Sequence, residues 1–203
     1  MAWAPLELGD GARSSLEKMA ANPRIKGVRR IIQFEPDQNF CLRPAFVHGV
    51  QLLSEYHFSF DICINHNQLA NTIRLVQQCP DTSFVLDHIG KPDIKNGLLD
   101  PWREQIAELA RIPNVVCKIS GLATEADNDH WTKAQLRPYI NHVIDCFGFE
   151  RVMFGGDWPV ATEATDCPRW VETLLWAVAG CSEIELTHLF RDTASRFYHL
   201  SIE

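Results

Sequence analysis

Residues 151–160 read "RVMFGGDWPV", an apolar run that stops at two glycines and is followed at once by an acid. The run 152–154 has the composition of a short buried strand. An acid directly after it cannot extend the strand, and glycine lets the backbone approach a ligand closely. Pro159 then fixes the direction in which the chain leaves. We therefore predict that the strand ends here in order to hold the carboxylate of Asp157 at the edge of a sheet.

Apolar runs of this kind alternate with helical patterns along the chain, which predicts an α/β fold. The helical patterns cover 44–56, 100–111 and 182–200. Strand starts are about 30 residues apart, the length of a βαβ unit, and runs buried on both faces are typical of a parallel sheet. The predicted strands cover 28–34, 58–65, 83–89, 114–120 and 152–155, with 2–8 as a weaker sixth because Pro5 cannot donate to a ladder.

Two architectures fit this alternation, a doubly wound open sheet and a (β/α)₈ barrel. Six units are visible, whereas a barrel has eight. Either the sheet is open, or the chain holds six units of a larger barrel. We see no linker or repeat, which predicts one domain over residues 1–203.

The composition favours a small-molecule partner. The chain has 19 Lys and Arg against 26 Asp and Glu, a formal charge of −7, so it lacks the basic surface typical of nucleic-acid binding. It contains no apolar run of the ~20 residues that cross a bilayer. Its amino terminus does not resemble a secretory signal, and seven cysteines without CxxC spacing indicate reduced thiols in a cytoplasmic location. The sequence leaves a homo-oligomer open.

Polar side chains recur where the predicted strands end. The carboxyl ends of parallel strands meet at one edge, which is where such folds carry their sites. We therefore predict that these side chains gather around a ligand or an active site. They are Arg29 and Gln33 on the first strand, His66 after the second, His88 after the third, Lys118 on the fourth and Asp157 after the last.

Structural explanations remain open for most of these residues. A buried histidine is commonly hydrogen-bonded within a core, and a lysine can direct its amine outward along the rim. Asp87 has the opposite strand parity to His88, so we expect it to point away from the shared centre and secure a loop. The other open alternatives are a core ion pair for Arg29, a plain strand-to-helix turn at His66 and a stiff wall at Trp158.

Five segments together resemble the lactonase branch of the amidohydrolase superfamily, the amidohydrolase-related (amidohydrolase 2) proteins. The segments are "IKGVRRIIQ", "VLDHIGKP", "VVCKISGL", "RVMFGGDWPV" and "ASRFYHL", in the order found in that family. The resemblance extends from about residue 2 to residue 200. The branch includes lactonases acting on L-fucono- and L-rhamnono-lactones and 2-pyrone-4,6-dicarboxylate lactonases. Gly156 stands where relatives usually have serine.

The resemblance implies a (β/α)₈ TIM barrel of the metal-dependent hydrolase type. The six visible units would be its third to eighth, so the first-strand HxH pair of the family is not among these residues. It also implies a hydrolase that opens a small sugar-acid or carboxylated lactone by attack of water. Asp157 would be the general base, His88 would orient the water or polarise the carbonyl, and substrate would be bound by Arg29, Lys118, Trp158, His66 and Gln33.

The resemblance leaves the metal open. Most of the superfamily uses a divalent ion such as zinc, while some lactonases of this branch work without one. His88 and Asp157 would be the ligands if an ion binds, and two ligands are fewer than the three of a catalytic zinc site. Two alternative functions also stay open, an amidohydrolase-related decarboxylase and a non-catalytic remnant of the barrel.

Overall fold

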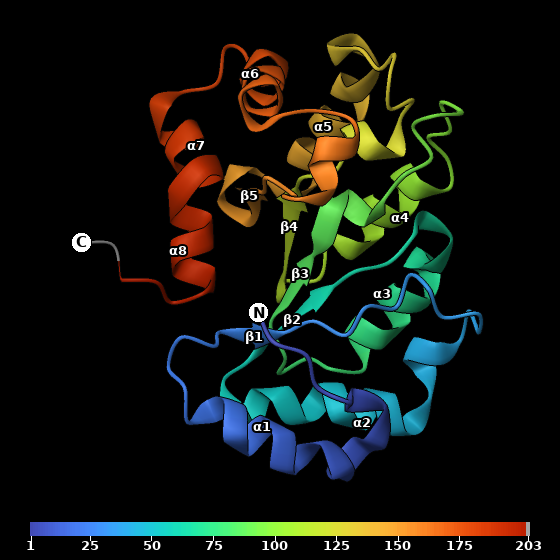
Figure 1. Ribbon diagram of the computed structural model, residues 1–203, viewed down its shortest axis with the longest axis vertical. Coiled ribbons are helices and arrows are strands. Elements are labelled where there is room, and N and C mark those ends of the chain that lie inside the picture. The colour runs from blue at the N-terminus through green and yellow to red at the C-terminus, as the bar shows by residue number, and fades with distance from the viewer. Residues whose placement is uncertain (202–203) are drawn as a thin grey trace.

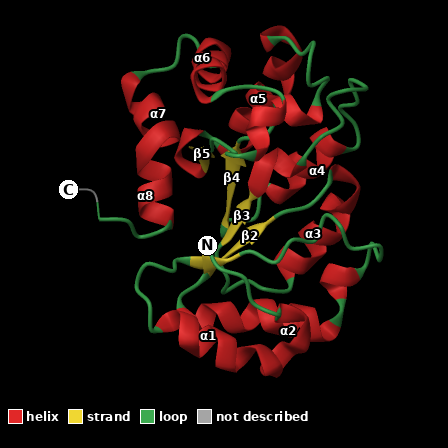
Figure 2. Cartoon of the chain, in the orientation of Figure 1, coloured by secondary structure: helices red, strands yellow, loops and turns green. Residues whose placement is uncertain are grey.

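The computed structural model describes residues 1–201 and shows a parallel sheet between two layers of helices (Figures 1 and 2). Its strands lie in the order β1-β2-β3-β4-β5, and each pairs with its sequence neighbour in parallel. A doubly wound sheet reverses its strand order at a switch point, whereas a barrel wall does not. The observed order is therefore that of a barrel wall. The strands are β1 Gly27–Val28, β2 Ser59–Ile62, β3 Phe84–Leu86, β4 Val115–Ile119 and β5 Val152–Phe154.

The five main predicted strands are found, but the first is much shorter than 28–34. It ends at Val28, and the amides of Ile32 and Gln33 then donate to the carbonyl of Cys63 without forming a ladder. The weak strand predicted over 2–8 is wrong. Only Ala2 pairs with Val28, in a single parallel bridge, and a 3₁₀ helix begins at Leu6. The physical reason is Pro5, which has no N–H to continue the pairing.

The helices begin and end near the predicted positions. The pattern 44–56 forms α2 and a 3₁₀ turn, 100–111 forms α4, and 182–200 forms α7, a π-helical turn and α8. Ser182 and Glu185 make the reciprocal hydrogen bonds of a capping box at the start of α7. The helices are α1 Arg13–Ala20, α2 Pro44–Gln51, α3 Leu69–Gln77, α4 Trp102–Leu109, α5 Lys133–Phe147, α6 Cys167–Ala177, α7 Glu183–Thr187 and α8 Thr193–Phe197.

The two faces of the sheet differ in chemistry. α3, α4 and α5 lie on one side and α7 and α8 on the other (Figure 1). The face toward α3–α5 is wholly apolar, with residues such as Phe60, Leu86 and Ile119 fully buried. None of the helices in residues 1–201 combines the length and the apolar character that a membrane span requires.

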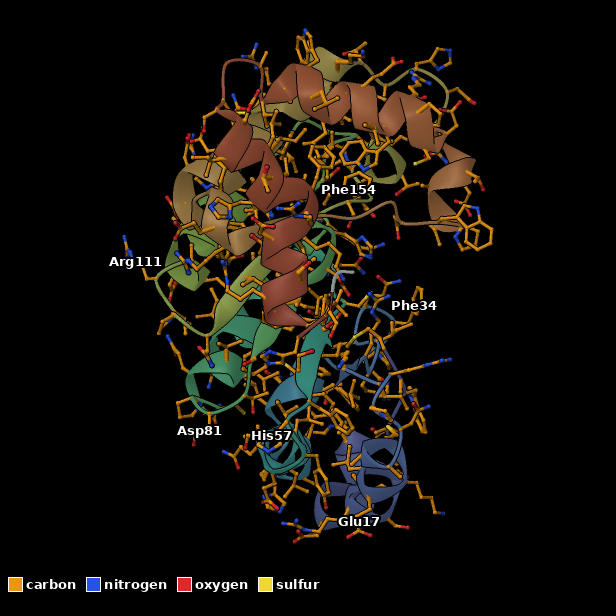
Figure 3. All side chains as sticks on the ribbon, turned by 90° about the vertical axis from the view of Figure 1, so that its left-hand side faces the viewer. Glu17, Phe34, His57, Asp81, Arg111 and Phe154 are labelled. Carbon is orange, nitrogen blue, oxygen red and sulfur yellow. The ribbon has the colours of Figure 1, made fainter. Side chains whose placement is uncertain are left out.

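The second face changes from apolar to polar along the strands. A layer of Val85, Val116 and Met153 is covered by side chains of α8 and the residue after it, and Figure 3 shows α8 lying over the strands. Two residues further along β3 and β4 stand Asp87 and Lys118. The polar side chains therefore follow the apolar layer toward the carboxyl edge, which is where the candidate site lies.

Candidate active site

His88 is placed by a left-handed turn that follows β3. His88 and Ile89 have φ values of 53° and 48° inside the turn Asp87–Gly90. Strand alternation therefore ends at Leu86, and Asp87 and His88 both face the polar side of the sheet. The prediction that Asp87 points away from the shared centre is wrong for this reason. Asp87 is fully buried and forms ion pairs there.

Asp157 follows β5 through two glycines that differ in what they do. A Cβ on Gly155 would lie 2.8 Å from the Cβ of Ser120 and 2.9 Å from Cγ of Lys118, so the neighbouring strand needs that space. A Cβ on Gly156 would meet nothing within 4 Å. Asp157 itself has a φ of 51°. The first glycine thus allows close approach to β4 and its following turn.

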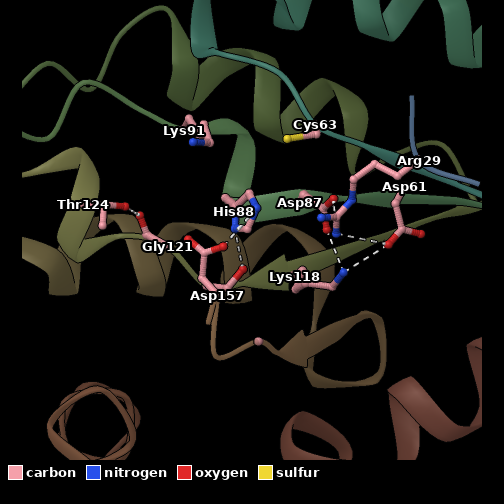
Figure 4. A network of polar contacts seen from close by, with 12 residues as sticks. Arg29, Asp61, Cys63, Asp87, His88, Lys91, Lys118, Gly121, Thr124 and Asp157 are labelled. Atoms are coloured by element: carbon pink, nitrogen blue, oxygen red, sulfur yellow. Dashed lines mark hydrogen bonds and ion pairs between the residues drawn. The ribbon is translucent and has the colours of Figure 1, made fainter. Parts of the chain in front are cut away.

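The imidazole of His88 and the carboxylate of Asp157 face each other (Figure 4). Nε2 of His88 lies 3.5 Å from Oδ1 of Asp157, and the two side chains are 8% and 13% exposed. On the other side of the ring, Nδ1 of His88 lies 2.8 Å from Oγ of Ser120. A Cβ on Gly121 would lie 2.8 Å from Oδ2 of Asp157 and 2.9 Å from Nδ1 of His88. The turn after β4 therefore packs closely against both side chains, and it leaves room for them because Gly121 has no side chain.

Burial sets the protonation states of this pair. It lowers the pKa of His88 to about 3, and the cations Lys91, Arg29 and Lys118 act in the same direction. Burial also raises the pKa of Asp157 above its ordinary value, against the effect of Lys91. His88 is consequently a neutral imidazole at physiological pH. The Asp157 carboxylate holds a proton more tightly than an exposed aspartate does, which makes it a stronger base.

Two cations and two buried carboxylates form an ion network beside the pair. Arg29 lies 2.8 Å from Asp87 and 3.6 Å from Asp61, and Lys118 lies 2.7 Å and 3.2 Å from the same two carboxylates. The hydroxyl of Tyr198 donates to Asp61 at 2.9 Å. Burial lowers the pKa of Lys118, but Asp87 and Asp61 outweigh it and the net shift is upward. Arg29 is thus a core ion-pair partner, and Lys118 points inward.

Asp61 was not among the predicted site residues, although the sequence contains a signal for it. It is an isolated acid inside the apolar run 58–65, and its side chain is fully buried. Buried charged groups are usually paired, so an acid inside this apolar run predicts a cation on a neighbouring strand. Period-two alternation places Ser120 on the same strand face as Lys118, but neither Ser120 nor Gly121 was among the predicted site residues.

Within residues 1–201, the remaining predicted residues form no hydrogen bond or ion pair with His88 or Asp157. Oε1 of Gln33 accepts a weak hydrogen bond from the thiol of Cys63 at 3.5 Å. Nδ1 of His66 lies 3.0 Å from the carbonyl oxygen of Lys91. The indole of Trp158 is 82% exposed, so the structure does not bring it into the group around His88.

The donor set does not fit a divalent metal ion. Cys63, Asp87 and His88 bring ligand atoms within 4.8 Å of one another, but Asp87 is already shared by Arg29 and Lys118. The thiol of Cys63 already donates to Oε1 of Gln33, and burial raises its pKa to about 11. The described residues therefore do not supply the three available ligands of a catalytic zinc site around His88.

A hollow of about 600 Å³ elsewhere in the molecule lacks comparable chemistry. It is lined by residues that include Arg111, Pro113 and Arg151, which precede β4 and β5. These positions lie at the amino ends of the strands, opposite the end that carries Asp157. Catalytic groups in barrel folds occupy the carboxyl ends. The His88–Asp157 pair is therefore the better candidate site.

The comparisons with known proteins agree with the fold and the motifs. The chain is 29% identical over 202 residues to an L-fucono-1,5-lactonase of Burkholderia ambifaria, covering 98% of this chain and 69% of that protein. It is 34% identical over 192 residues to an L-fucono-1,5-lactonase of Burkholderia multivorans, covering 87% of this chain and 64% of that protein. The chain thus spans about two thirds of the length of these curated relatives.

A solved structure shares the same backbone arrangement. It is an amidohydrolase of Burkholderia multivorans with bound zinc, which is 31% identical and superposes with a TM-score of 0.90 over 99% of this chain and 73% of that one. The sequence profile of the amidohydrolase family matches residues 1–200. The chain therefore belongs to the amidohydrolase family.

Proposed function

We propose that the protein is a hydrolase that opens an uncharged sugar-acid lactone by attack of water. The observation that carries the proposal is the contact between His88 and Asp157 at 3.5 Å, at the carboxyl edge of the barrel wall. Support also comes from the similarity to two L-fucono-1,5-lactonases. The residue roles proposed below follow from the chemistry of the site.

Asp157 acts as the general base in this proposal. Lactone hydrolysis requires that water attacks the ester carbonyl while it loses a proton, that the oxyanion is stabilised, and that the departing alkoxide is protonated. The raised pKa of Asp157 suits the first step. The same proton can then pass from Asp157 to the alkoxide. His88, which is neutral, donates a hydrogen bond toward the carbonyl oxygen.

The charges beside the pair favour a neutral substrate over a dicarboxylate. Arg29 and Lys118 contribute two positive charges, and Asp61 and Asp87 contribute two negative charges within 2.7–3.6 Å of them. The next cation outward, Lys91, is paired with Glu125 at 3.1 Å. A dicarboxylate would need unpaired cations to replace its hydration. Neutral hydroxyl groups can instead accept hydrogen bonds from the 33%-exposed side chain of Arg29.

The test is a substrate panel assayed with the purified protein at neutral pH. It contains L-fucono-1,5-lactone, an L-rhamnono-lactone and 2-pyrone-4,6-dicarboxylate, with ring opening followed by acid release. We expect kcat/KM for the neutral lactones to exceed that for the dicarboxylate by at least about a hundredfold, the cost of one poorly paired buried charge. Preference for the dicarboxylate would contradict the charge argument.

A second assay separates lactone opening from the alternative reactions. Carbon dioxide release from 2,6-dihydroxybenzoate, without lactone hydrolysis, would indicate a decarboxylase and overturn the proposal. A folded protein that turns over none of these compounds would indicate a non-catalytic barrel, which would also overturn it. Asp157→Asn is the control for every positive signal, because true turnover at this site depends on the carboxylate.

A further inference from the structure

Ser120 contacts the ring nitrogen of His88 that faces away from Asp157. Its Oγ lies 2.8 Å from Nδ1 of His88, and the serine side chain is fully buried. The serine follows β4, whereas His88 and Asp157 follow β3 and β5. β4, which lies between β3 and β5, thus supplies a hydrogen-bond partner for the His88–Asp157 pair.

The hydroxyl hydrogen of Ser120 has one acceptor available to it. Among residues 1–201, its only side-chain hydrogen-bond partner is Nδ1 of His88. A buried hydroxyl that does not donate loses the hydrogen bond that it makes to water in the unfolded chain without replacing it, which costs free energy. Ser120 therefore donates to Nδ1, which must carry a lone pair. A neutral imidazole then holds its single proton on Nε2.

The opposite side of the ring favours the same tautomer. Nε2 lies 3.5 Å from the carboxylate oxygen of Asp157. A proton on Nε2 faces that carboxylate favourably, whereas a lone pair on Nε2 would oppose it. Within residues 1–201, the other charged groups near the ring are Asp87, whose carboxylate lies within 4.8 Å of a ring nitrogen, and the cations Lys91, Arg29 and Lys118, which disfavour a second proton on it.

We propose that Ser120 is a positioning residue that fixes His88 in the Nε2–H tautomer, so that the imidazole can only donate toward Asp157 and the substrate. In this arrangement His88 cannot compete with Asp157 as a base. It stabilises the ionised carboxylate before attack and the developing oxyanion during attack. The consequence for turnover rests on the proposed lactonase function, but the tautomer itself does not.

The direct test is an NMR experiment on the protein without substrate. Long-range proton–nitrogen correlations of protein labelled with ¹⁵N-histidine identify which ring nitrogen carries the proton, and His88→Gln assigns the signal. We expect a neutral ring at pH 7 with the proton on Nε2. A proton on Nδ1, or a charged ring at pH 7, would overturn the proposal whether or not the protein hydrolyses lactones.

Three variants test the role of the hydroxyl. Ser120→Ala should allow both tautomers, lower kcat for the lactone by about 10²-fold with little change in KM, and move the acid limb of the pH–rate profile upward. Ser120→Thr keeps a hydroxyl and should restore the tautomer and the profile. Thr82→Val removes another buried hydroxyl, which donates to Val50, and should change stability without moving the profile.

The outcomes distinguish the two proposals. If Ser120→Ala keeps the Nε2–H tautomer and the wild-type pH profile, the positioning role is wrong while the lactonase function stands. If the Nε2–H tautomer depends on Ser120 but no lactone is opened, the proposed function fails and the structural assignment of the tautomer stands.

Discussion

Nε2 of His88 and Oδ1 of Asp157 lie 3.5 Å apart although the two residues follow strands that are not neighbours. β4 lies between them, and the turn that follows it contains Gly121 with a φ of 67°. A Cβ at this glycine would lie within 2.9 Å of both side chains. The contact thus depends on a missing side chain in the intervening turn.

Replacing Gly121 with alanine should separate the pair. The new methyl group would collide with Asp157 Oδ2 and His88 Nδ1, at 2.8 Å and 2.9 Å. We expect kcat to fall by about 10²-fold or more, since a displaced base loses its alignment with water. Gly97→Ala is the matched control, because Gly97 also has a φ of 67° but nothing within 4 Å. Equal activity losses in the two variants would show that backbone strain, rather than the collision, is responsible.

The buried imidazole should make the protein sensitive to acid. The pKa of His88 is about 3 in the folded protein and near 6.5 when unfolded, so below pH 6.5 the unfolded chain binds a proton that the folded chain excludes. The free energy of unfolding should therefore fall by about 2 kcal/mol between pH 7 and pH 5 from this residue alone. Urea unfolding of His88→Gln should show a flatter pH dependence. His57→Asn, at an exposed histidine, should keep the wild-type slope.

Loss of a cation from the ion network should destabilise the folded protein. Lys118→Met removes one of two positive charges that face Asp61 and Asp87, both fully buried. Leaving buried carboxylates short of a partner costs about 3–5 kcal/mol, which urea unfolding at pH 7 measures. Lys18→Met, on an exposed face of α1, should change stability by less than about 0.5 kcal/mol. A Lys118→Met protein as stable as the Lys18→Met protein would contradict the network.

Removing one carboxylate from the network should change which ligands bind. Asp61→Asn leaves Arg29 and Lys118 with a single anionic partner, Asp87. We expect 2-pyrone-4,6-dicarboxylate to inhibit lactone hydrolysis at least about tenfold more strongly in this variant, as one unpaired cation becomes available. Thermal unfolding confirms that the variant is folded. An unchanged inhibition constant in a folded variant would show that the network charge does not select the substrate.

The parallel units and the edge that carries the polar residues could be predicted from the sequence, whereas the strand order could not, since a doubly wound sheet and a barrel both fit the spacing. The regular spacing of the apolar runs indicates parallel units, and period-two alternation correctly places Lys118 on the polar face. Alternation fails for His88, because the backbone turns left-handed there and a lone histidine in "LDHIGKP" does not reveal its φ of 53°. The sequence could not identify the ion-pair partners of Arg29 for a related reason. An ion pair between neighbouring strands depends on register, which only the structure shows.

The loops at the edge were harder to predict than the strands. "FGGDWPV" correctly marks a strand that ends in an acid, yet it does not tell which glycine is sterically required. Gly155 is, because side chains of β4 occupy the space, and Gly156 is not. Trp158 directly follows Asp157 and stays a predicted pocket residue; its high exposure could not be predicted from its place in the sequence.

The rate of opening of L-fucono-1,5-lactone by Asp157→Asn, compared with the wild-type protein, tests the central claim most directly. Asparagine keeps the size of the side chain and one acceptor oxygen, replaces the other oxygen with an amide donor, and removes the basicity. If Asp157 takes the proton from water, kcat should fall by about 10³-fold or more, while Asp129→Asn, at an exposed acid, keeps the wild-type rate. A folded Asp157→Asn protein that opens the lactone as fast as the wild type would contradict the account.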